Sequence, residues 1–205
     1  MDSRTFFETI YRADAPWDVG AAQPSMLELL REWPPSGPVL DVGCGTGDLA
    51  IELARNGLDV LGIDFIEAAI AVARDRAARA EGELEGSLEF RVGDALRPSA
   101  LGRTFGAVVD SGFFHVFEAP ERLRLAGELA AVVRPGGLYY LHAFAVEFPI
   151  PNTPRIVTER ELQELFTQEN GWRILGTRPA EFHSRVAPPV PALTACVERS
   201  RVTAR

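Results

Sequence analysis

The sequence contains no lysine: all 21 basic side chains among its 205 residues are arginine. Without lysine, the chain cannot form a Schiff base with a carbonyl substrate or hold pyridoxal phosphate as an imine. It also lacks the lysine that a phosphate-binding loop directs at the phosphates of a nucleotide. These mechanisms are excluded before any motif is considered.

Cysteine and long apolar runs are also scarce. The only cysteines, Cys44 and Cys196, lie far apart and lack metal-ligand spacing, so no metal site is expected and a reducing compartment is the simpler interpretation. The N-terminus has no apolar stretch of signal-peptide length, and no run elsewhere approaches the length of a membrane span. We expect one soluble, cytoplasmic domain with no membrane partner.

Basic side chains are fewer than acidic ones: 21 against 29, which gives a net charge of −8. Nucleic-acid binding draws most of its affinity from neutralising phosphates with basic side chains. The balance therefore argues against a nucleic-acid partner. The sequence gives no basis for an oligomeric state.

What the chain does contain, from residue 38 onward, is an alternation of short β-type runs and amphipathic helical runs. Strands are expected at residues 38–43, 58–64, 88–95, 105–112, 138–144, 172–182 and 192–199, and helices at 47–57, 66–82, 120–137 and 158–171. This alternation predicts an α/β fold, a Rossmann-like, doubly wound and mostly parallel seven-stranded sheet with helices on both faces.

Ligands of such sheets bind outside the carboxyl ends of the strands. Consecutive expected strands end at or beside an aspartate, namely Asp41, Asp64, Asp94 and Asp110. The carboxyl edge of the sheet is therefore expected to be acidic.

The first of these strands runs into the glycine loop of "VLDVGCGTGDLAIELARNG", residues 39–57. Gly43 and Gly45 permit a tight turn and a close approach of backbone N–H groups to a ligand. A dinucleotide fingerprint would need a third glycine where Asp48 stands. An aspartate in the first turn of a helix disfavours a pyrophosphate, and Asp41 suits a cationic group. The loop predicts a ligand without phosphate.

The stretch "LDVGCGTG" resembles motif I of the class I S-adenosylmethionine-dependent methyltransferases. The resemblance continues through "VLGIDF", "RVGDAL", "VVDSGFF" and "VVRPGGLYYL" in the order and spacing of that family. It implies S-adenosyl-L-methionine as cofactor, a sulfonium cation that carries no phosphate.

The resemblance also implies a set of cofactor contacts. Asp41 and the loop of Gly43, Cys44 and Gly45 would face the methionine part, Asp64 the ribose hydroxyls, Phe65 the adenine ring, and Asp94 with the Ala95 N–H the adenine edge, while Asp110 closes the fourth strand beside the substrate loop.

Residues 1–37 precede the first strand and are expected to form a helical cap on a methyltransferase domain of residues 38–205. The segment "FFETIYRADAPWDVGAAQPSMLELL" resembles the N-terminus of the thiopurine/thiol/halide methyltransferase group and related bacterial small-molecule methyltransferases, through Trp17, Asp18, Gly20, Gln23 and Pro24. In that group the tryptophan lies near the cofactor and the segment covers the active site. The alternative is a helix packed on the sheet edge, with Trp17 as its anchor.

Two chemical classes of methyl acceptor agree with the sequence. A thiolate, thiopurine or halide is a soft nucleophile and needs no general base, whereas a phenol or amine of an aromatic or secondary metabolite gains about 10²–10⁴-fold from one. His115 is the candidate base, and a structural imidazole hydrogen-bonded in the pocket floor is its alternative role. Tyr11 is a second candidate, as a hydrogen-bond partner of the substrate. A protein that binds the cofactor without catalysis is a further alternative.

Aromatic residues cluster near these candidates. Phe113, Phe114, Phe117 and Phe148 could wall a pocket for an apolar, planar small molecule. Core packing is expected to account for at least two of them.

Overall fold

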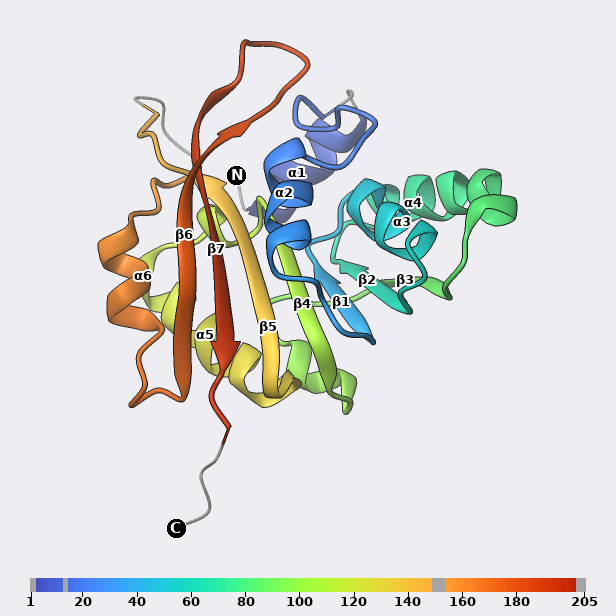
Figure 1. The fold of residues 1–205 in the computed structure, drawn as a ribbon. Helices are drawn as coiled ribbons and strands as arrows, with labels where there is room; N and C mark the ends of the chain where they lie inside the picture. The colour runs from blue at the N-terminus through green and yellow to red at the C-terminus, as the bar shows by residue number, and fades with distance from the viewer. Residues whose placement is uncertain (1–2, 13–14, 149–153, 202–205) are drawn as a thin grey trace.

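The computed structural model describes residues 3–12, 15–148 and 154–201. The outermost residues of the expected cap and domain, 1–2 and 202–205, lie outside this part. One seven-stranded sheet runs through the molecule in the order β3-β2-β1-β4-β5-β7-β6 (Figure 1). Its strands are β1 Val39–Val42, β2 Val60–Asp64, β3 Leu88–Val92, β4 Phe105–Ser111, β5 Val133–Phe144, β6 Trp172–Phe182 and β7 Val190–Arg199.

The first five strands pair in parallel, and β7 is inserted antiparallel between β5 and β6. The strand order reverses direction beside β1, because β2 lies on one side of it and β4 on the other. This is the switch point at which doubly wound sheets bind ligands. The predicted fold is confirmed.

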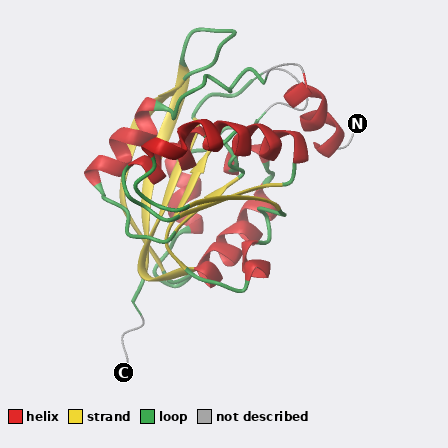
Figure 2. Ribbon diagram, turned by 90° about the vertical axis from the view of Figure 1, so that its right-hand side faces the viewer, coloured by secondary structure: helices red, strands yellow, loops and turns green. Residues whose placement is uncertain are grey.

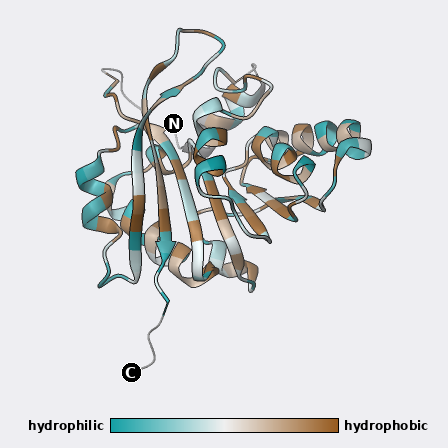
Figure 3. Cartoon of the chain, viewed as in Figure 1, coloured by the Kyte–Doolittle hydropathy of each residue, from teal (hydrophilic) through white to brown (hydrophobic). Residues whose placement is uncertain are grey.

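Helices cover both faces of the sheet (Figure 2). Their bounds are α1 Ser3–Arg12, α2 Pro24–Glu32, α3 Asp48–Arg55, α4 Glu67–Ala80, α5 Ala119–Val132 and α6 Glu159–Leu165. One core layer joins α5 and α6 to the sheet, and the other joins α2, α3 and α4. Alternate residues of β5 supply both layers, with Tyr139 in the first and Tyr140 in the second. Hydrophobic residues accordingly concentrate in the strands, and α6 is mostly hydrophilic (Figure 3).

Local sequence explains where three of the helices begin. Pro24 and Pro120 stand in the first turns of α2 and α5, and Thr158 caps α6 by accepting a hydrogen bond from the Glu161 N–H. The end of α5 differs from expectation, because the helix stops at Val132 rather than at Pro135. The chain enters β5 directly there, and a register shift against β4 accommodates the proline and glycines.

Candidate active site

A pocket opens at the carboxyl edge of the sheet, beneath the N-terminal segment. It encloses about 1170 Å³ of atom-free space, mouth included, which suits a small-molecule site. Its walls come from α1 and the following segment, the loop after β1, the end of β2, the β4–α5 connection, β5 and β6. The lining includes Phe7, Tyr11, Trp17, Asp18, Gln23, Asp41, Gly43, Cys44, Gly45, Thr46, Asp48, Asp64, Phe65, Ser111, Phe113, His115, Phe117, Phe144 and Phe182.

The glycine loop forms the floor of one end. Gly43 and Gly45 have positive φ angles of 64° and 53°, a conformation that favours glycine. A Cβ on Gly43 would lie 2.5 Å from the Phe113 ring, and one on Gly45 would lie 2.8 Å from the Tyr11 hydroxyl. The absence of side chains therefore keeps the loop backbone close to the aromatic walls.

Asp64 lines the pocket at the end of β2. Its carboxylate accepts hydrogen bonds from the Gly45 N–H at 3.0 Å and the Ile66 N–H at 2.8 Å. Burial raises the pKa of Asp64, and the bonds from Ile66 and Gly45 oppose that shift. The two bonds fix the carboxylate against the glycine loop and leave lone pairs for a ligand.

Asp41, on β1, is the most unusual group in the lining. It is 2% exposed, and its Oδ2 has no hydrogen-bond partner among the described residues. Burial, followed by the charges of Asp110 and Asp64, raises the pKa of this carboxyl well above its usual range. An orphaned buried carboxyl oxygen suits a ligand that brings a cation or a hydrogen-bond donor.

The remaining predicted cofactor contacts lie around this end. Phe65 and Cys44 line the pocket, whereas Asp94, Ala95 and Asp110 are not part of its lining. Asp94 is exposed and its carboxylate accepts from the Leu96 N–H, and Ala95 is buried in the core.

Asp110 is fully buried and bonded within the protein. Its carboxylate accepts from the N–H groups of Phe113 and Phe114 and from the Tyr139 hydroxyl, and burial raises its pKa to about 7. The structure therefore places Asp110 outside the pocket lining, as a support of the β4–α5 connection, which carries His115.

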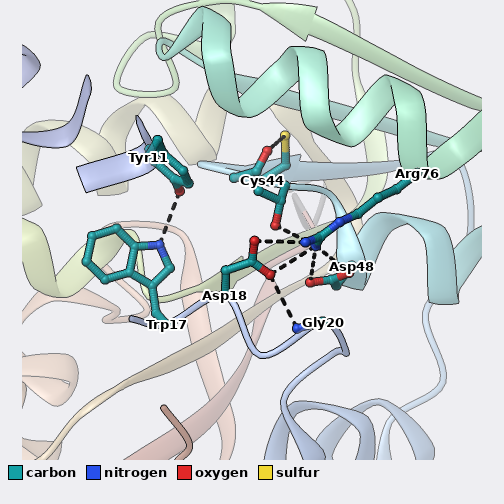
Figure 4. Close-up of polar contacts among 9 residues, drawn as sticks. Tyr11, Trp17, Asp18, Gly20, Cys44, Asp48 and Arg76 are labelled. Carbon is teal, nitrogen blue, oxygen red and sulfur yellow. Dashed lines mark hydrogen bonds and ion pairs between the residues drawn. The ribbon is translucent and has the colours of Figure 1, made fainter. Parts of the chain in front are cut away.

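Trp17 and Tyr11 meet over the glycine loop. The indole Nε1–H donates to the Tyr11 hydroxyl at 3.2 Å, and the rings stand edge to face (Figure 4). Burial, and next the charge of Asp64, raises the pKa of Tyr11, so the side chain is a neutral phenol. Tyr11 can therefore donate a hydrogen bond but cannot serve as a base.

Arg76, on α4, joins the N-terminal segment to the glycine-loop helix (Figure 4). Its guanidinium bonds Asp18 at 2.8 and 3.0 Å, Asp48 at 2.8 and 2.9 Å, and the Thr46 hydroxyl at 2.9 Å. We call this group of four side chains the Arg76 clasp. Asp48 is therefore paired with a cation, which weakens the repulsion of phosphate expected from its position in the first turn.

The charge of the lining still favours a cationic ligand. The described residues that line the pocket include Asp18, Asp41, Asp48 and Asp64 but no arginine. Arg76 neutralises one charge of the Asp18–Asp48 pair, and the excess remains negative. A phosphorylated ligand would meet no basic side chain in this lining.

The opposite end of the pocket is aromatic. Phe113, Phe117, Phe144 and Phe182 line it together with His115. The His115 ring stacks on Phe144 with centroids 4.4 Å apart and planes at 11°, and the Phe144 N–H donates to its Nδ1 at 3.2 Å. Burial lowers the pKa of His115 to about 3, with further contributions from His142 and Arg122. His115 is thus a neutral imidazole bonded in the pocket wall.

The other predicted aromatic residues have different places. Phe114 is fully buried in the core, and Phe148 packs edge to face on Phe144 without lining the pocket. Two of the four phenylalanines named from the sequence therefore belong to packing. His142 is also internal, since its Nε2 lies 3.2 Å from the Glu181 carbonyl and its ring stacks on Phe182.

The segment between α1 and α2 is bound to the β6–β7 hairpin as well as to α4. The Gln23 side chain accepts from the His183 N–H at 2.9 Å and donates to the His183 carbonyl at 3.0 Å, as a neighbouring strand would. Ser25 makes a similar pair of bonds, both at 3.3 Å, with the backbone of Glu181. These contacts close the roof of the pocket.

Sequence reasoning missed Arg76, Phe144 and Phe182. A signal for Arg76 exists, because Ala69, Ala73 and Ala80 form the buried stripe of α4 and Arg76 falls on it at helical spacing. The two phenylalanines end β5 and β6 and carry no signal of their own, since their place depends on strand pairing across the sheet.

Comparison with known proteins agrees with this geometry. Residues 39–137 match the family model of a methyltransferase domain. The chain is 30% identical over 188 residues to 2-heptyl-1-hydroxyquinolin-4(1H)-one methyltransferase of Mycobacteroides abscessus, covering 87% of this chain and 81% of that protein. A match to magnesium-protoporphyrin O-methyltransferase of Rhodobacter capsulatus, 42% identical, spans 44% of this chain and only 38% of that protein.

Solved structures agree as well. One, reported for the conversion of a disulfide bond into a thioacetal group during echinomycin biosynthesis, is 29% identical with a TM-score of 0.81, covering 98% of this chain and 94% of that one. An S-adenosylmethionine-dependent methyltransferase from Methanosarcina mazei is 25% identical with a TM-score of 0.71, covering 88% and 99%.

A doubly wound sheet with an acidic, glycine-floored pocket at its switch point defines the class of protein. The chain belongs to the class I S-adenosylmethionine-dependent methyltransferases. S-Adenosylmethionine supplies a methyl group on a positively charged sulfur that leaves readily. Among the described residues, no helix is long and apolar enough to cross a membrane, and no cluster of ligating side chains could hold a metal ion.

Proposed function

We propose that this methyltransferase transfers the methyl group to a soft or acidic heteroatom of a small, planar, apolar molecule. The observation that carries the proposal is one continuous pocket with two different ends. One end is acidic around Asp41 and Asp64, and the other is aromatic around His115. The first suits a nucleoside sulfonium and the second suits an apolar ring.

At the acidic end, the assignments follow the chemistry of the side chains. Asp64 has free lone pairs beside Gly45 and is proposed to accept from the ribose hydroxyls. The unpartnered Oδ2 of Asp41 is proposed to receive the ammonium group of the methionine part, above the Gly43–Gly45 turn. Trp17 and Cys44 stay as proposed neighbours of the cofactor.

At the adenine end, Phe65 is proposed to pack against the base, because it lines the pocket directly after β2. Asp94 and the Ala95 N–H stay as proposed contacts of the adenine edge. An exposed carboxylate after β3 can bind a ligand group without first losing a buried partner.

Residues 1–37 are proposed to act as the cap of the acceptor side, over the domain of residues 38–205. Tyr11, Trp17 and Gln23 bring this segment into the pocket lining, and Gln23 also ties it to the hairpin. A roof of this kind excludes water from the methyl transfer. The rate of this displacement depends on aligning the two reactants, and that alignment can lower the activation free energy by about 7–11 kcal/mol.

Two acceptor chemistries have support. A sulfur nucleophile, as in a thiol or thiopurine, agrees with the structural similarity to the protein of thioacetal formation. A ring hydroxyl agrees with the similarity to the hydroxyquinolone methyltransferase. Both are heteroatoms on apolar molecules, and the aromatic end of the pocket accommodates either.

An acceptor screen tests the proposal. S-Adenosylhomocysteine release is measured with thiophenols, thiopurines, iodide, N-hydroxyquinolones, phenols and aromatic amines. Turnover of thiols or ring hydroxyls supports the proposed class, and turnover of amines alone contradicts it. Cofactor binding without turnover of any of these would instead indicate a binding protein.

A further inference from the structure

The β4–β5 edge gives His115 an unusual partner. β4 ends at Ser111, whereas β5 continues to Phe144. On the side of β5 that faces β4, the His142 carbonyl still accepts from the Gly112 N–H. Phe144, two residues further, presents its N–H on the same side with no strand left to receive it, and the Nδ1 of His115 accepts it at 3.2 Å.

This bond fixes the tautomer of the imidazole. A backbone N–H can only donate, so Nδ1 must offer its lone pair and the proton of the neutral ring sits on Nε2. Protonating Nδ1 would set two N–H groups against each other and leave the Phe144 donor unsatisfied. Nε2 carries the proton already and has no lone pair to give, so neither nitrogen can take a proton from a substrate.

The surroundings of the His115 ring also disfavour its protonation. The ring is 4% exposed, stacks on Phe144 and lies 5.7 Å from the Phe182 ring. The charged or titratable groups that affect it are His142 on β5 and Arg122 on α5, and both disfavour an added positive charge. No described group bonds Nε2, and the ring lines the pocket.

We propose that His115 is a fixed Nε2–H donor that binds the acceptor heteroatom in its ionised form, and not the base that deprotonates it. This rests on the proposed function and names its substrate class. The acceptors are molecules whose nucleophilic atom ionises near neutral pH: aromatic thiols, N-hydroxy heteroaromatics and acidic phenols. A donor held in an apolar wall favours an anion over a neutral atom, because charge-assisted hydrogen bonds are roughly twice as strong.

The reaction then balances without a protein base. The acceptor loses its proton to solvent before or as it binds. Its lone pair forms the new bond to the methyl carbon while the carbon–sulfur bond breaks, and that electron pair stays on sulfur. An anion and a sulfonium cation give two neutral products, and His115 keeps its proton throughout.

The first test reads the tautomer directly by ¹⁵N–¹H correlation NMR of the full chain labelled at its three histidines. Assignment uses His115→Gln and, as the matched control outside the pocket, His183→Leu. We expect a protonated Nε2 and a bare Nδ1 on His115 from pH 6 to 9. A proton on Nδ1, or an imidazolium that titrates near neutrality, overturns the proposal without any substrate being known.

The second test uses substituted thiophenols and phenols with acceptor pKa values of about 5–10, spanning the range in which free thiols and phenols ionise. For the wild type, the midpoint of the pH profile of kcat/KM should follow the pKa of each acceptor. His115→Gln keeps an N–H donor and no basic nitrogen, so it should remain within about tenfold of wild type, whereas His115→Leu should weaken acceptor binding about tenfold or more.

Other results contradict the inference in recognisable ways. A fixed midpoint for all acceptors, or a loss in His115→Gln as deep as the 10²–10⁴-fold expected for a missing base, would make His115 the base. Acceptor binding is measured separately with S-adenosylhomocysteine present, where no reaction occurs. Wild type that binds this product but turns over no acceptor would refute the proposed function, while the NMR result still decides the tautomer.

Discussion

The two ends of the pocket are held by contacts of different range. At the proposed cofactor end, the Asp64 carboxylate accepts from the N–H groups of Ile66 and Gly45, within one strand–loop–helix unit and its neighbour. At the proposed acceptor end, the Gln23 side chain bonds the backbone of His183, 160 positions away in the sequence. Contacts of the first kind are set by local sequence, whereas those of the second kind depend on how distant segments of this chain pack together. The proposed cofactor site is thus built locally, beneath a proposed acceptor roof that distant segments of the chain form together.

The largest effect should come from the locally built end, where we expect S-adenosylhomocysteine to bind. Asp64→Ala should weaken binding of S-adenosylhomocysteine about 100-fold or more, because two charge-assisted hydrogen bonds to ribose are worth about 1.5–3 kcal/mol each. Isothermal titration calorimetry measures the loss. Asp59→Ala is the matched control, an exposed aspartate just before the same strand whose carboxylate bonds Ser87. If Asp64→Ala and wild type bind S-adenosylhomocysteine equally well, Asp64 does not bind the ribose.

The second largest effect should come from Arg76, which connects the N-terminal segment to the helix after the glycine loop. Arg76→Gln leaves Asp18 and Asp48 facing each other, partly buried, with side chains 14% and 19% exposed. We expect a loss of about 1–3 kcal/mol in the free energy of unfolding, less than for a fully buried pair because water still screens the group. Urea unfolding measures it, and hydrogen exchange should show lost protection in residues 15–23.

The control is Arg79→Gln, one turn along α4, whose side chain is 76% exposed and pairs with Asp75. It should change the free energy of unfolding by less than about 0.5 kcal/mol. Adding Asp18→Asn to Arg76→Gln should restore part of the loss, since it removes the repulsion. No recovery in that double variant would mean that Arg76 acts through packing and not through charge.

The sequence predicted the short-range side well. Glycines with positive φ, aspartates at strand ends and the alternation of strands and helices are all local, so Gly43, Gly45, Asp41 and Asp64 were found and the structure brings them together. Asp110 shows the limit of this reasoning. Its position at a strand end is as regular as the others, but its carboxylate bonds Phe113, Phe114 and Tyr139 inside the core.

The long-range side was predicted less well. The Trp17–Pro24 pattern is visible in the sequence, but the partners of Asp18 and Gln23 lie on α4 and on the β6–β7 hairpin. No local pattern shows that Gln23 pairs with a backbone 160 positions away. The sequence marks His115 as a candidate. Its bond to Phe144 depends on β5 extending beyond the end of β4, which a sequence does not show.

The third prediction tests the roof alone. Gln23→Ala removes two hydrogen bonds, worth about 0.5–1.5 kcal/mol each, so we expect KM for the acceptor to rise about tenfold. The Kd of S-adenosylhomocysteine should stay within about twofold, because the proposed contacts of Asp41 and Asp64 with the cofactor do not involve His183. Gln163→Ala, an exposed glutamine on α6, is the matched control. If the KM of the acceptor and the Kd of S-adenosylhomocysteine rise equally, the roof and the proposed cofactor site behave as one cooperative unit.

The smallest effect concerns Asp41 and pH. Burial and the charges of Asp110 and Asp64 raise the pKa of this carboxyl in the free protein. A ligand ammonium beside it favours the ionised form, so its pKa is lower in the complex. Between these two pKa values the free protein carries a proton that the complex lacks. Binding therefore releases a fraction of one proton, and affinity rises with pH, by no more than about tenfold per pH unit.

Calorimetry of S-adenosylhomocysteine in two buffers of different ionisation enthalpy counts the released protons. Adenosine, which lacks the amino-acid part, is the control ligand and should release none. Asp41→Asn should abolish the release for S-adenosylhomocysteine while leaving adenosine unchanged, because Asn cannot ionise but keeps the size of the side chain. If adenosine releases as many protons as S-adenosylhomocysteine, the titrating group faces the nucleoside. Asp64 would then replace Asp41 as the source, and the ammonium would bind elsewhere on the glycine loop.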